Sequence, residues 1–390
     1  MIEPRLTSVS SSSPGGRLRR AGRVCGALAA LGGCVAVLPQ PAPSADLTTI
    51  RLPPGFAIEL FAKDLGYARV LTLDPRGTLL VSVPRAGRVL ALPDDDRDGR
   101  ADAAVPVVDG LDLPHGLVFL DGRLYVAETG RILRFDYDPA ARRVRGEPVI
   151  VVPDLPPRGG HWTRTITVGP DRRLYVSVGS SCNNCEERDP RRAAIYRYGP
   201  DGSGGAPFAT GLRNAVGLAF RPGTGELWAT VNGRDWLGDD RPAEYVTRIE
   251  EGGFYGWPHC HWTAGGLVQD PDLGGRERCR AVRRPDLLYQ AHAAPLGLAF
   301  YTGAQFPPEY RGDAFVALHG SWNRSVPVGY KVIRVRLGEA TPLAEDFATG
   351  WLAGSRSWGR PVDLAVASDG ALFLSDDGLG AVYRITYRGG

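Results

Sequence analysis

Three short clusters in the middle of the chain combine residue types that suit chemistry. His161 offers an imidazole, Arg213 stands directly before Asn214, and Gly233-Arg234 belongs to a glycine-containing loop rich in backbone carbonyls. Together they offer a base, a permanent cation with an adjacent amide, and oxygen donors. The sequence contains no serine elbow, P-loop or dinucleotide fingerprint that would indicate a different active site.

The elements that must position these clusters are short strands in a repeated pattern. A strand, a turn with Gly or Asp and a second apolar strand recur, with spacings of 46, 49, 52, 80 and 66 residues, from starts at Val70, Gly116, Thr165, Gly217, Gly297 and Asp363. Helical periodicity is nearly absent, and 51 Gly with 32 Pro fit a turn-rich fold. The pattern predicts an all-β, six-bladed β-propeller over residues 46–390, with an insertion at about 259–295. Loops at one mouth of the propeller would then bring the three clusters together.

The N-terminus has the pattern of an export signal. Basic residues precede a mostly small or apolar stretch from Val24 to Leu38, which is too short and too weakly apolar for a membrane span. Cleavage after Ala45 would give a periplasmic or secreted protein with no transmembrane span. Alternatively, Leu31-Gly-Gly-Cys34 resembles a lipoprotein box, which would place a lipid anchor on Cys34.

Charge and cysteine content narrow the classes of partner. The chain has 46 basic and 43 acidic residues, and five arginines and one glutamate lie in residues 1–45, so 41 basic and 42 acidic residues remain. We therefore expect no nucleic-acid binding. Beyond the leader, four cysteines suggest the disulfides Cys182–Cys185 and Cys260–Cys279. A redox pair or half of a zinc site remains the alternative for Cys182-Asn-Asn-Cys185.

Several motifs, in order, resemble the soluble quinoprotein sugar dehydrogenases, and within them the sorbosone dehydrogenase-like branch. The resemblance covers roughly residues 50–388. Its segments are His161 with 166–176, Gly211-Leu-Arg-Asn-Ala-Val-Gly-Leu-Ala-Phe220, Gly252-Gly-Phe-Tyr-Gly-Trp-Pro258, 234–240 and His319-Gly-Ser-Trp-Asn-Arg324. The resemblance implies a propeller that binds pyrroloquinoline quinone with calcium and oxidises aldoses or related sugars.

The resemblance also assigns roles. His161 matches the general base that takes a hydroxyl proton while hydride leaves carbon. Arg213 and Asn214 match a pair that stabilises negative charge and orients the cofactor or substrate. Gly233 and Arg234 fall where two backbone carbonyls ligate the calcium of the cofactor, although better-known members have Gly-Pro there.

Other positions depart from the family pattern. In Gly359-Arg360-Pro-Val362 only Arg360 remains of two cofactor-binding arginines, and His319 replaces a cofactor-contacting lysine. We hypothesise that His319 and Arg324 supply the missing positive partners of the quinone carboxylates. His115, at another blade entry, either faces the same mouth or is structural.

An acidic segment, Asp94 to Asp102, resembles a calcium loop. Asp94, Asp96 and Asp98 occupy its first, third and fifth positions, but Val105 stands where the bidentate Glu is required. The segment is therefore either a structural calcium site or a solvated acidic turn.

These features favour an exported quinoprotein that oxidises a sugar hydroxyl or hydrated sugar aldehyde. Without a haem motif (CxxCH), its electron acceptor must be external. One alternative is a calcium-dependent propeller lactonase that uses Glu128, Asn232 and Asp376. The other is a propeller that only binds a protein or glycan.

Overall fold

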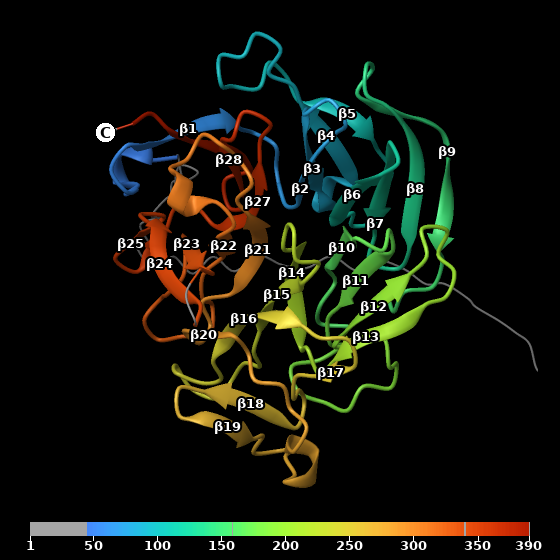
Figure 1. Ribbon diagram of the computed structural model, residues 1–390, viewed down its shortest axis with the longest axis vertical. Helices are drawn as coiled ribbons and strands as arrows, with labels where there is room; N and C mark the ends of the chain where they lie inside the picture. Colours follow the sequence, from blue (N-terminus) through green and yellow to red (C-terminus); the bar gives the residue numbers. More distant parts are fainter. Residues whose placement is uncertain (1–44, 158, 339–340, 390) are drawn as a thin grey trace, which may run out of the picture. The chain divides into compact units, whose positions relative to one another are not determined.

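The computed structural model describes residues 45–157, 159–338 and 341–389, and this part of the chain is nearly all β. Six antiparallel blades are arranged around a centre (Figure 1), which confirms the predicted six-bladed propeller. The predicted export signal and Cys34 lie outside the described residues. Within the described ranges, no helix is long and apolar enough to cross a membrane.

Each blade has four principal strands. The first strands contact their neighbours in a closed ring and are β2 (Leu71–Leu73), β6 (Gly116–Leu120), β10 (Arg164–Val168), β14 (Asn214–Phe220), β21 (Pro295–Phe300) and β27 (Pro361–Val366). The second strands are β3 (Leu79–Val83), β7 (Arg123–Ala127), β11 (Leu174–Val178), β15 (Leu227–Asn232), β22 (Ala314–Leu318) and β28 (Leu372–Asp376).

The outer half of each blade is more exposed. The third strands are β4 (Arg88–Leu92), β8 (Ile132–Asp138), β12 (Ala194–Tyr198), β16 (Glu244–Ile249), β23 (Lys331–Arg336) and β29 (Ala381–Tyr387). The fourth strands are β5 (Val105–Val108), β9 (Arg143–Val152), β13 (Ala206–Thr210), β20 (Leu287–Tyr289), β24 (Leu343–Ala348) and β1 (Phe56–Ala62).

The aliphatic second strands explain why the repeat is visible in the sequence. Every residue of β3, β11, β22 and β28 is buried, because each of these strands has a neighbouring blade on both faces. Such strands need nearly continuous Val, Leu, Ala and Phe. The strand signal is therefore strongest close to the centre of each blade.

The last blade is completed by the N-terminal strand. β1 pairs antiparallel with β29, so residues more than three hundred positions apart close the ring. Phe56 on β1 contacts the rings of Phe306, Phe347 and Tyr387 at centroid distances of 4.8, 5.1 and 4.9 Å. The closure is therefore held by an aromatic cluster as well as by strand hydrogen bonds.

An insertion separates the third and fourth strands of the fourth blade. Between β16 and β20 it contains β17 (Gly253–Phe254), which pairs in parallel with β13 of the preceding blade, and the hairpin β18 (Cys260–Thr263)–β19 (Gly266–Gln269). The hairpin lies outside the ring at the bottom of Figure 1. The expected insertion at about 259–295 overlaps this segment, but its last part includes β20, which belongs to the blade.

The short remaining elements are a hairpin, β25 (Leu352–Ala353)–β26 (Arg356–Ser357), and four 3₁₀ turns. The turns are η1 (Leu47–Thr49), η2 (Pro84–Ala86), η3 (Glu277–Cys279) and η4 (Pro308–Tyr310). Both expected disulfides, Cys182–Cys185 and Cys260–Cys279, are confirmed.

Removal of the Phe56 side chain should weaken the closure of the propeller by β1. We expect Phe56→Ala to lower the free energy of unfolding by about 2–4 kcal/mol, because it leaves a gap among the aromatic rings that join β1 to the last two blades. Guanidinium denaturation measures this. Val149→Ala on the exposed strand β9 is the control and should change stability by less than about 0.5 kcal/mol. Equal effects of the two substitutions would contradict the role of β1.

Candidate functional site

A cavity of about 510 Å³ opens at one mouth of the propeller. Most of its lining comes from residues at the starts of the first strands, or just before them, in five of the six blades. Six of the residues singled out from the sequence line it together: His161, Arg213, Asn214, Gly233, His319 and Arg360. Residues from four separate blades therefore line one cavity.

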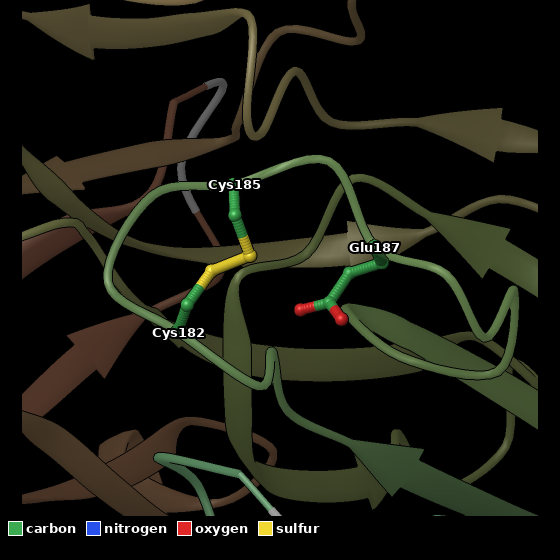
Figure 2. Close-up of side chains that lie close together, drawn as sticks. All are labelled: Cys182, Cys185 and Glu187. Atoms are coloured by element: carbon green, nitrogen blue, oxygen red, sulfur yellow. A yellow bond between two sulfur atoms is a disulfide. The ribbon is translucent and has the colours of Figure 1, made fainter.

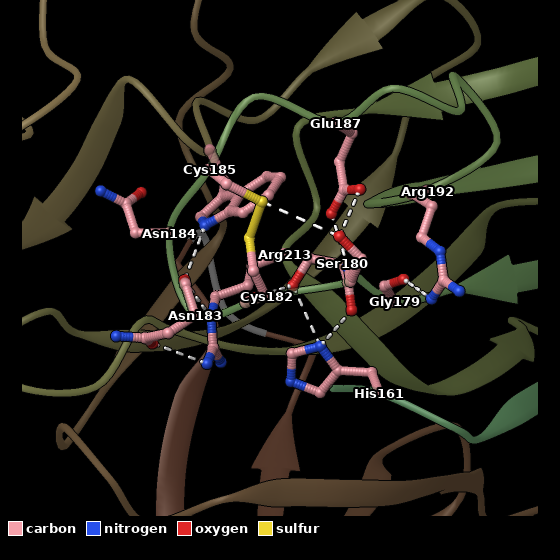
Figure 3. Close-up of a disulfide and its surroundings, with 12 residues drawn as sticks. His161, Gly179, Ser180, Cys182, Asn183, Asn184, Cys185, Glu187, Arg192 and Arg213 are labelled. Carbon is pink, nitrogen blue, oxygen red and sulfur yellow. Dashed lines mark hydrogen bonds between the residues drawn. A yellow bond between two sulfur atoms is a disulfide. The ribbon is translucent and has the colours of Figure 1, made fainter. Parts of the chain in front are cut away.

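The ring of His161 is fixed in one tautomer by the loop that follows β11 (Figure 3). Its Nδ1 lies 2.9 Å from the Ser180 carbonyl oxygen and 3.0 Å from Ser180 Oγ. Ser180 Oγ donates its own hydrogen to the Cys182 carbonyl at 2.6 Å, so both Ser180 oxygens act as acceptors towards the ring. The proton must therefore sit on Nδ1, which leaves the lone pair of Nε2 available as a base.

Burial, together with the positive charge of Arg213, lowers the pKa of His161 to about 3. A neutral imidazole is therefore maintained throughout the physiological pH range. The backbone of the His161 loop is held by Arg164, which donates to the carbonyl oxygens of His161 and Thr163 at 3.1 and 2.7 Å. Gly179 permits this packing, since a Cβ there would lie 2.6 Å from both His161 Cβ and Asn214 Oδ1.

Arg213 is held by oxygens from two loops. Its Nε and Nη2 donate to the carbonyl and side-chain oxygens of Asn183 at 3.0 and 2.9 Å, and Nη2 also pairs with Asp235 at 2.9 Å. Its Nη1 donates to the Gly233 carbonyl. The neighbouring Asn214 leaves its buried Oδ1 without a hydrogen-bond partner among the described residues. An unpartnered buried acceptor in a cavity wall is a ready contact for a ligand donor.

The Cys182–Cys185 disulfide closes the loop that holds both groups (Figures 2 and 3). The Cys182 carbonyl accepts a hydrogen bond from the Ser180 hydroxyl, which lies against His161, and the Asn183 carbonyl accepts one from Arg213. Glu187 lies beside the disulfide and accepts from the Ser181 hydroxyl at 2.8 Å. Through these contacts the disulfide-closed loop positions both groups, and its bonded sulfurs provide no thiolate for zinc.

Gly233 and Arg234 are adjacent in the chain but have different surroundings. A Cβ on Gly233 would lie 2.6 Å from Pro242 Cγ, so the close approach of that proline requires glycine. Gly233 lines the cavity, whereas the Arg234 side chain turns towards the insertion and pairs with Asp270 at 2.6 Å and Asp272 at 3.0 Å. Replacement of the usual proline by Arg234 thus ties this loop to the insertion.

Two arginines supply most of the remaining positive charge of the cavity wall. The Arg360 guanidinium donates to the carbonyl oxygens of His319 and Gly320 and, within the described part of the chain, has no carboxylate partner. Arg69, which no sequence motif indicated, pairs with Asp377 at 2.6 Å, and its buried Nε has no partner among the described residues. No local motif marks Arg69, because it reaches the cavity from the start of the first blade.

Burial disfavours the charged form of His319. Its Nε2 lies 2.8 Å from the Asp377 carboxylate, yet burial lowers the pKa of His319 to about 4. As a neutral ring it donates Nε2–H to Asp377 and offers only an acceptor at Nδ1. The structure therefore favours Arg69 over His319 as the second positive group.

The other candidates lie away from the cavity lining. His115 is buried against Trp162, with its Nδ1 3.3 Å from the Arg164 carbonyl. Arg324 bonds to Asp239 and Asp240. The carboxylates of Asp94, Asp96 and Asp98 gather in the connection between β4 and β5 of the first blade.

The residues expected for a lactonase have structural partners. Glu128 accepts from the Asp112 amide at 2.7 Å and from Arg131, and Asp376 accepts from three backbone amides and the Tyr383 hydroxyl. Neither residue lines the cavity, although Asn232 does. The set of oxygen ligands that a lactonase would need is therefore not assembled in this cavity.

Fold and cavity define a six-bladed propeller with a neutral base and several cations at one mouth. A family profile described as TrAA12-like matches residues 50–388, so the chain belongs to this family. It is similar to a pyrroloquinoline quinone-dependent pyranose dehydrogenase of Coprinopsis cinerea (29% identity, 86% of this chain, 54% of the relative). An uncharacterised protein of Borreliella burgdorferi is 28% identical (87% of this chain, 92% of the relative). The chain thus spans about half the length of the Coprinopsis cinerea relative.

Solved structures share the fold. The holo pyranose dehydrogenase quinone domain of Coprinopsis cinerea gives a TM-score of 0.75 at 24% identity, over 89% of this chain and 98% of that one. The quinone-bound aldose sugar dehydrogenase of Streptomyces coelicolor gives 0.60 at 20% identity, over 86% and 99%. At these identities the likeness establishes the fold alone.

Opening the Cys182–Cys185 ring should loosen the bonds around Arg213. In Cys182→Ser/Cys185→Ser we expect faster hydrogen exchange at the amides of Ser180 and Asp235, which donate to Arg213 O and Asn183 Oδ1. Exchange measured by mass spectrometry tests this. Cys260→Ser/Cys279→Ser is the matched control and should leave these amides protected. Similar exchange in both variants would contradict the role of the loop.

The lowered pKa of His161 predicts a specific pH dependence of stability. Its folded pKa of about 3 lies below the unfolded value of about 6.5, so the unfolded chain binds more protons between them. The contribution of His161 is fully present above pH 6.5 and declines as pH falls. Relative to His161→Asn, the wild type should lose about 1–2 kcal/mol of unfolding free energy from pH 7 to 5. If the unfolding free energies of the wild type and His161→Asn changed in parallel with pH, the lowered pKa of buried His161 would be contradicted.

Proposed function

We propose that this protein is a quinone-dependent oxidoreductase that oxidises a hydroxyl, or a hydrated aldehyde, of an aldose- or sorbosone-type sugar. The observation that carries the proposal is the free Nε2 of His161 in a cavity that also contains Arg360 without a carboxylate partner. The name of the Coprinopsis cinerea relative supports pyrroloquinoline quinone as the cofactor. Relatives named for glucose or aldose oxidation share the fold.

The cavity wall fits an anionic quinone. Pyrroloquinoline quinone carries three carboxylates, and Arg360, Arg69 and Arg213 would hold them or the quinone oxygens. The unpartnered Nε of Arg69 and Oδ1 of Asn214 are unsatisfied polar atoms that such a ligand could pair. When bound, the quinone supplies the hydride acceptor and a calcium ion supplies Lewis acidity.

Calcium would be held by backbone carbonyls of Gly233 and Arg234. Carbonyl oxygens suit this hard cation, and a bonded carbonyl retains a second lone pair, so the hydrogen bond from Arg213 to Gly233 does not exclude ligation. Gly233 lines the cavity. Arg234 does not line it, and Asp270 and Asp272 hold its side chain, so Arg234 would contribute through its main chain alone.

The residues of this chain would divide the chemistry as follows. His161 Nε2 accepts the proton of the substrate hydroxyl as hydride leaves the same carbon, and its Nδ1–H bond to Ser180 keeps the ring oriented. Arg213, fixed by Asn183 and Asp235, stabilises the negative charge that develops beside it. The product is a lactone or an acid, depending on the form of the substrate.

The cellular setting belongs to the same proposal. Two disulfides suit an oxidising compartment, which agrees with export to the periplasm or medium. Export as a soluble protein and a lipid anchor at Cys34 are the two arrangements we propose. In either one, an external acceptor removes the electrons from the reduced cofactor.

The test uses the intact protein, the quinone, calcium and a dye acceptor with a panel of aldoses and sorbosone. We expect saturable, quinone-dependent activity that falls at least about 100-fold in His161→Asn. Asparagine can still donate to Ser180 but has no base at the Nε2 position.

The matched control is His259→Asn, in a histidine that lies outside the cavity lining and bonds to Leu273. Its activity should equal that of the wild type. Retention of full activity by His161→Asn, or an absence of quinone binding in the wild type, would contradict the proposal.

A further inference from the structure

Two tryptophans stand at the outer edge of the cavity. Trp236 and Trp322 both line it, yet each residue is 66% exposed, and their rings meet at 85° with centroids 5.2 Å apart. Arg213 and Asn214 in the same wall are only 6% and 8% exposed. The tryptophans therefore form the rim, and the candidate catalytic groups lie deeper.

The two loops that carry these rings are tied together. Arg324 donates to the Asp239 carbonyl and pairs with Asp240 at 3.0 Å, and the Ser325 amide donates to Asp239 at 3.0 Å. His292 Nε2 donates to the Gly238 carbonyl at 2.9 Å. Arg324, expected from the sequence to contact the cofactor, instead joins the two tryptophan loops.

The residues next to each tryptophan are also fixed. Asp235 exchanges two hydrogen bonds with Asn183, at 3.1 and 2.7 Å, and Trp236 itself has a φ of 70°, a left-handed conformation that is costly for a bulky residue. Ser321 bonds to Val328 and Tyr330. The rings are thus presented to solvent by a rigid framework.

Rigidly held, exposed tryptophans are typical of ligand contacts. The apolar face of an indole matches the C–H face of a sugar ring, and neither indole N–H has a hydrogen-bond partner in the described part of the chain, so both can donate to hydroxyls. This combination suits an uncharged polyol with an apolar face.

We propose that Trp236 and Trp322 form a platform for a second sugar ring, so that the substrate is a disaccharide or a longer saccharide. This inference rests on the proposed function for the reactive ring, which would enter the deeper cavity next to His161. The depth difference separates the two positions, because a ring held by the 66% exposed tryptophans lies outside the buried Arg213–Asn214 wall. Because the two indole planes are nearly perpendicular, one sugar ring could contact both of them.

The first test is binding to the quinone-free protein, by calorimetry, of glucose, maltose, cellobiose and the corresponding trisaccharides. We expect at least one of the disaccharides to bind more tightly than glucose. The double variant Trp236→Ala/Trp322→Ala should bind that disaccharide about tenfold more weakly and bind glucose as the wild type does. Val326→Ala, in an equally exposed residue of the same loop that does not line the cavity, is the control and should behave as the wild type.

The second test is kinetic. With the loaded enzyme, the double variant should raise KM for the disaccharide about tenfold at unchanged kcat, with glucose kinetics unaffected. Equal losses for glucose and disaccharide, or disaccharide binding unaffected by the double variant, would overturn the proposal. Saccharide binding by the apoprotein without quinone-dependent activity would refute the proposed function and leave the platform standing.

Discussion

The site depends on one electrostatic arrangement, a permanent positive charge fixed beside a buried neutral imidazole. Arg213 helps to keep the pKa of His161 low, and the Ser180 carbonyl determines which ring nitrogen carries the proton. Both groups contact one loop: within the Cys182–Cys185 ring, Asn183 accepts from Arg213, and the Cys182 carbonyl accepts from the hydroxyl of Ser180, which lies against His161. A base near a cation loses proton affinity but is available over a wider pH range. A bound anionic ligand would restore part of that affinity.

The propeller and its approximate strand positions could be predicted because the second strands are buried on both faces. Their apolar composition, as in β22 or β28, makes the repeat recognisable in the sequence without knowledge of which strands pair. The closure by β1 could not be predicted in the same way. Residues 56–62 are half-buried and lie three hundred positions from β29, so no local pattern connects them. The parallel pairing of β17 with β13 is a non-local contact of the same kind.

The sequence predicted which residues share a cavity where a motif and a strand end coincide, as at His161, Arg213 and Asn214, while their roles stay predictions. Prediction was weaker where function depends on side-chain direction. His319 and Arg324 were expected to be positive partners of the cofactor, but Asp377 and Asp239 engage them. Arg69 and Asn183 were missed because their importance comes from contacts with other blades or loops. In the sequence, Trp236 and Trp322 stood out only as parts of motifs, since the amino-acid sequence does not show whether a tryptophan is exposed to solvent.

The most direct test of this account is the protonation state of His161 in solution. Two-dimensional proton–nitrogen NMR of histidine-labelled protein, with His161 assigned from the missing signal of a substituted variant, distinguishes the two tautomers from imidazolium. The account predicts a neutral ring with the proton on Nδ1 and an unprotonated Nε2 from pH 5 to pH 8 in the quinone-free protein. A proton on Nε2, or titration near the ordinary pKa of about 6.5, would contradict it.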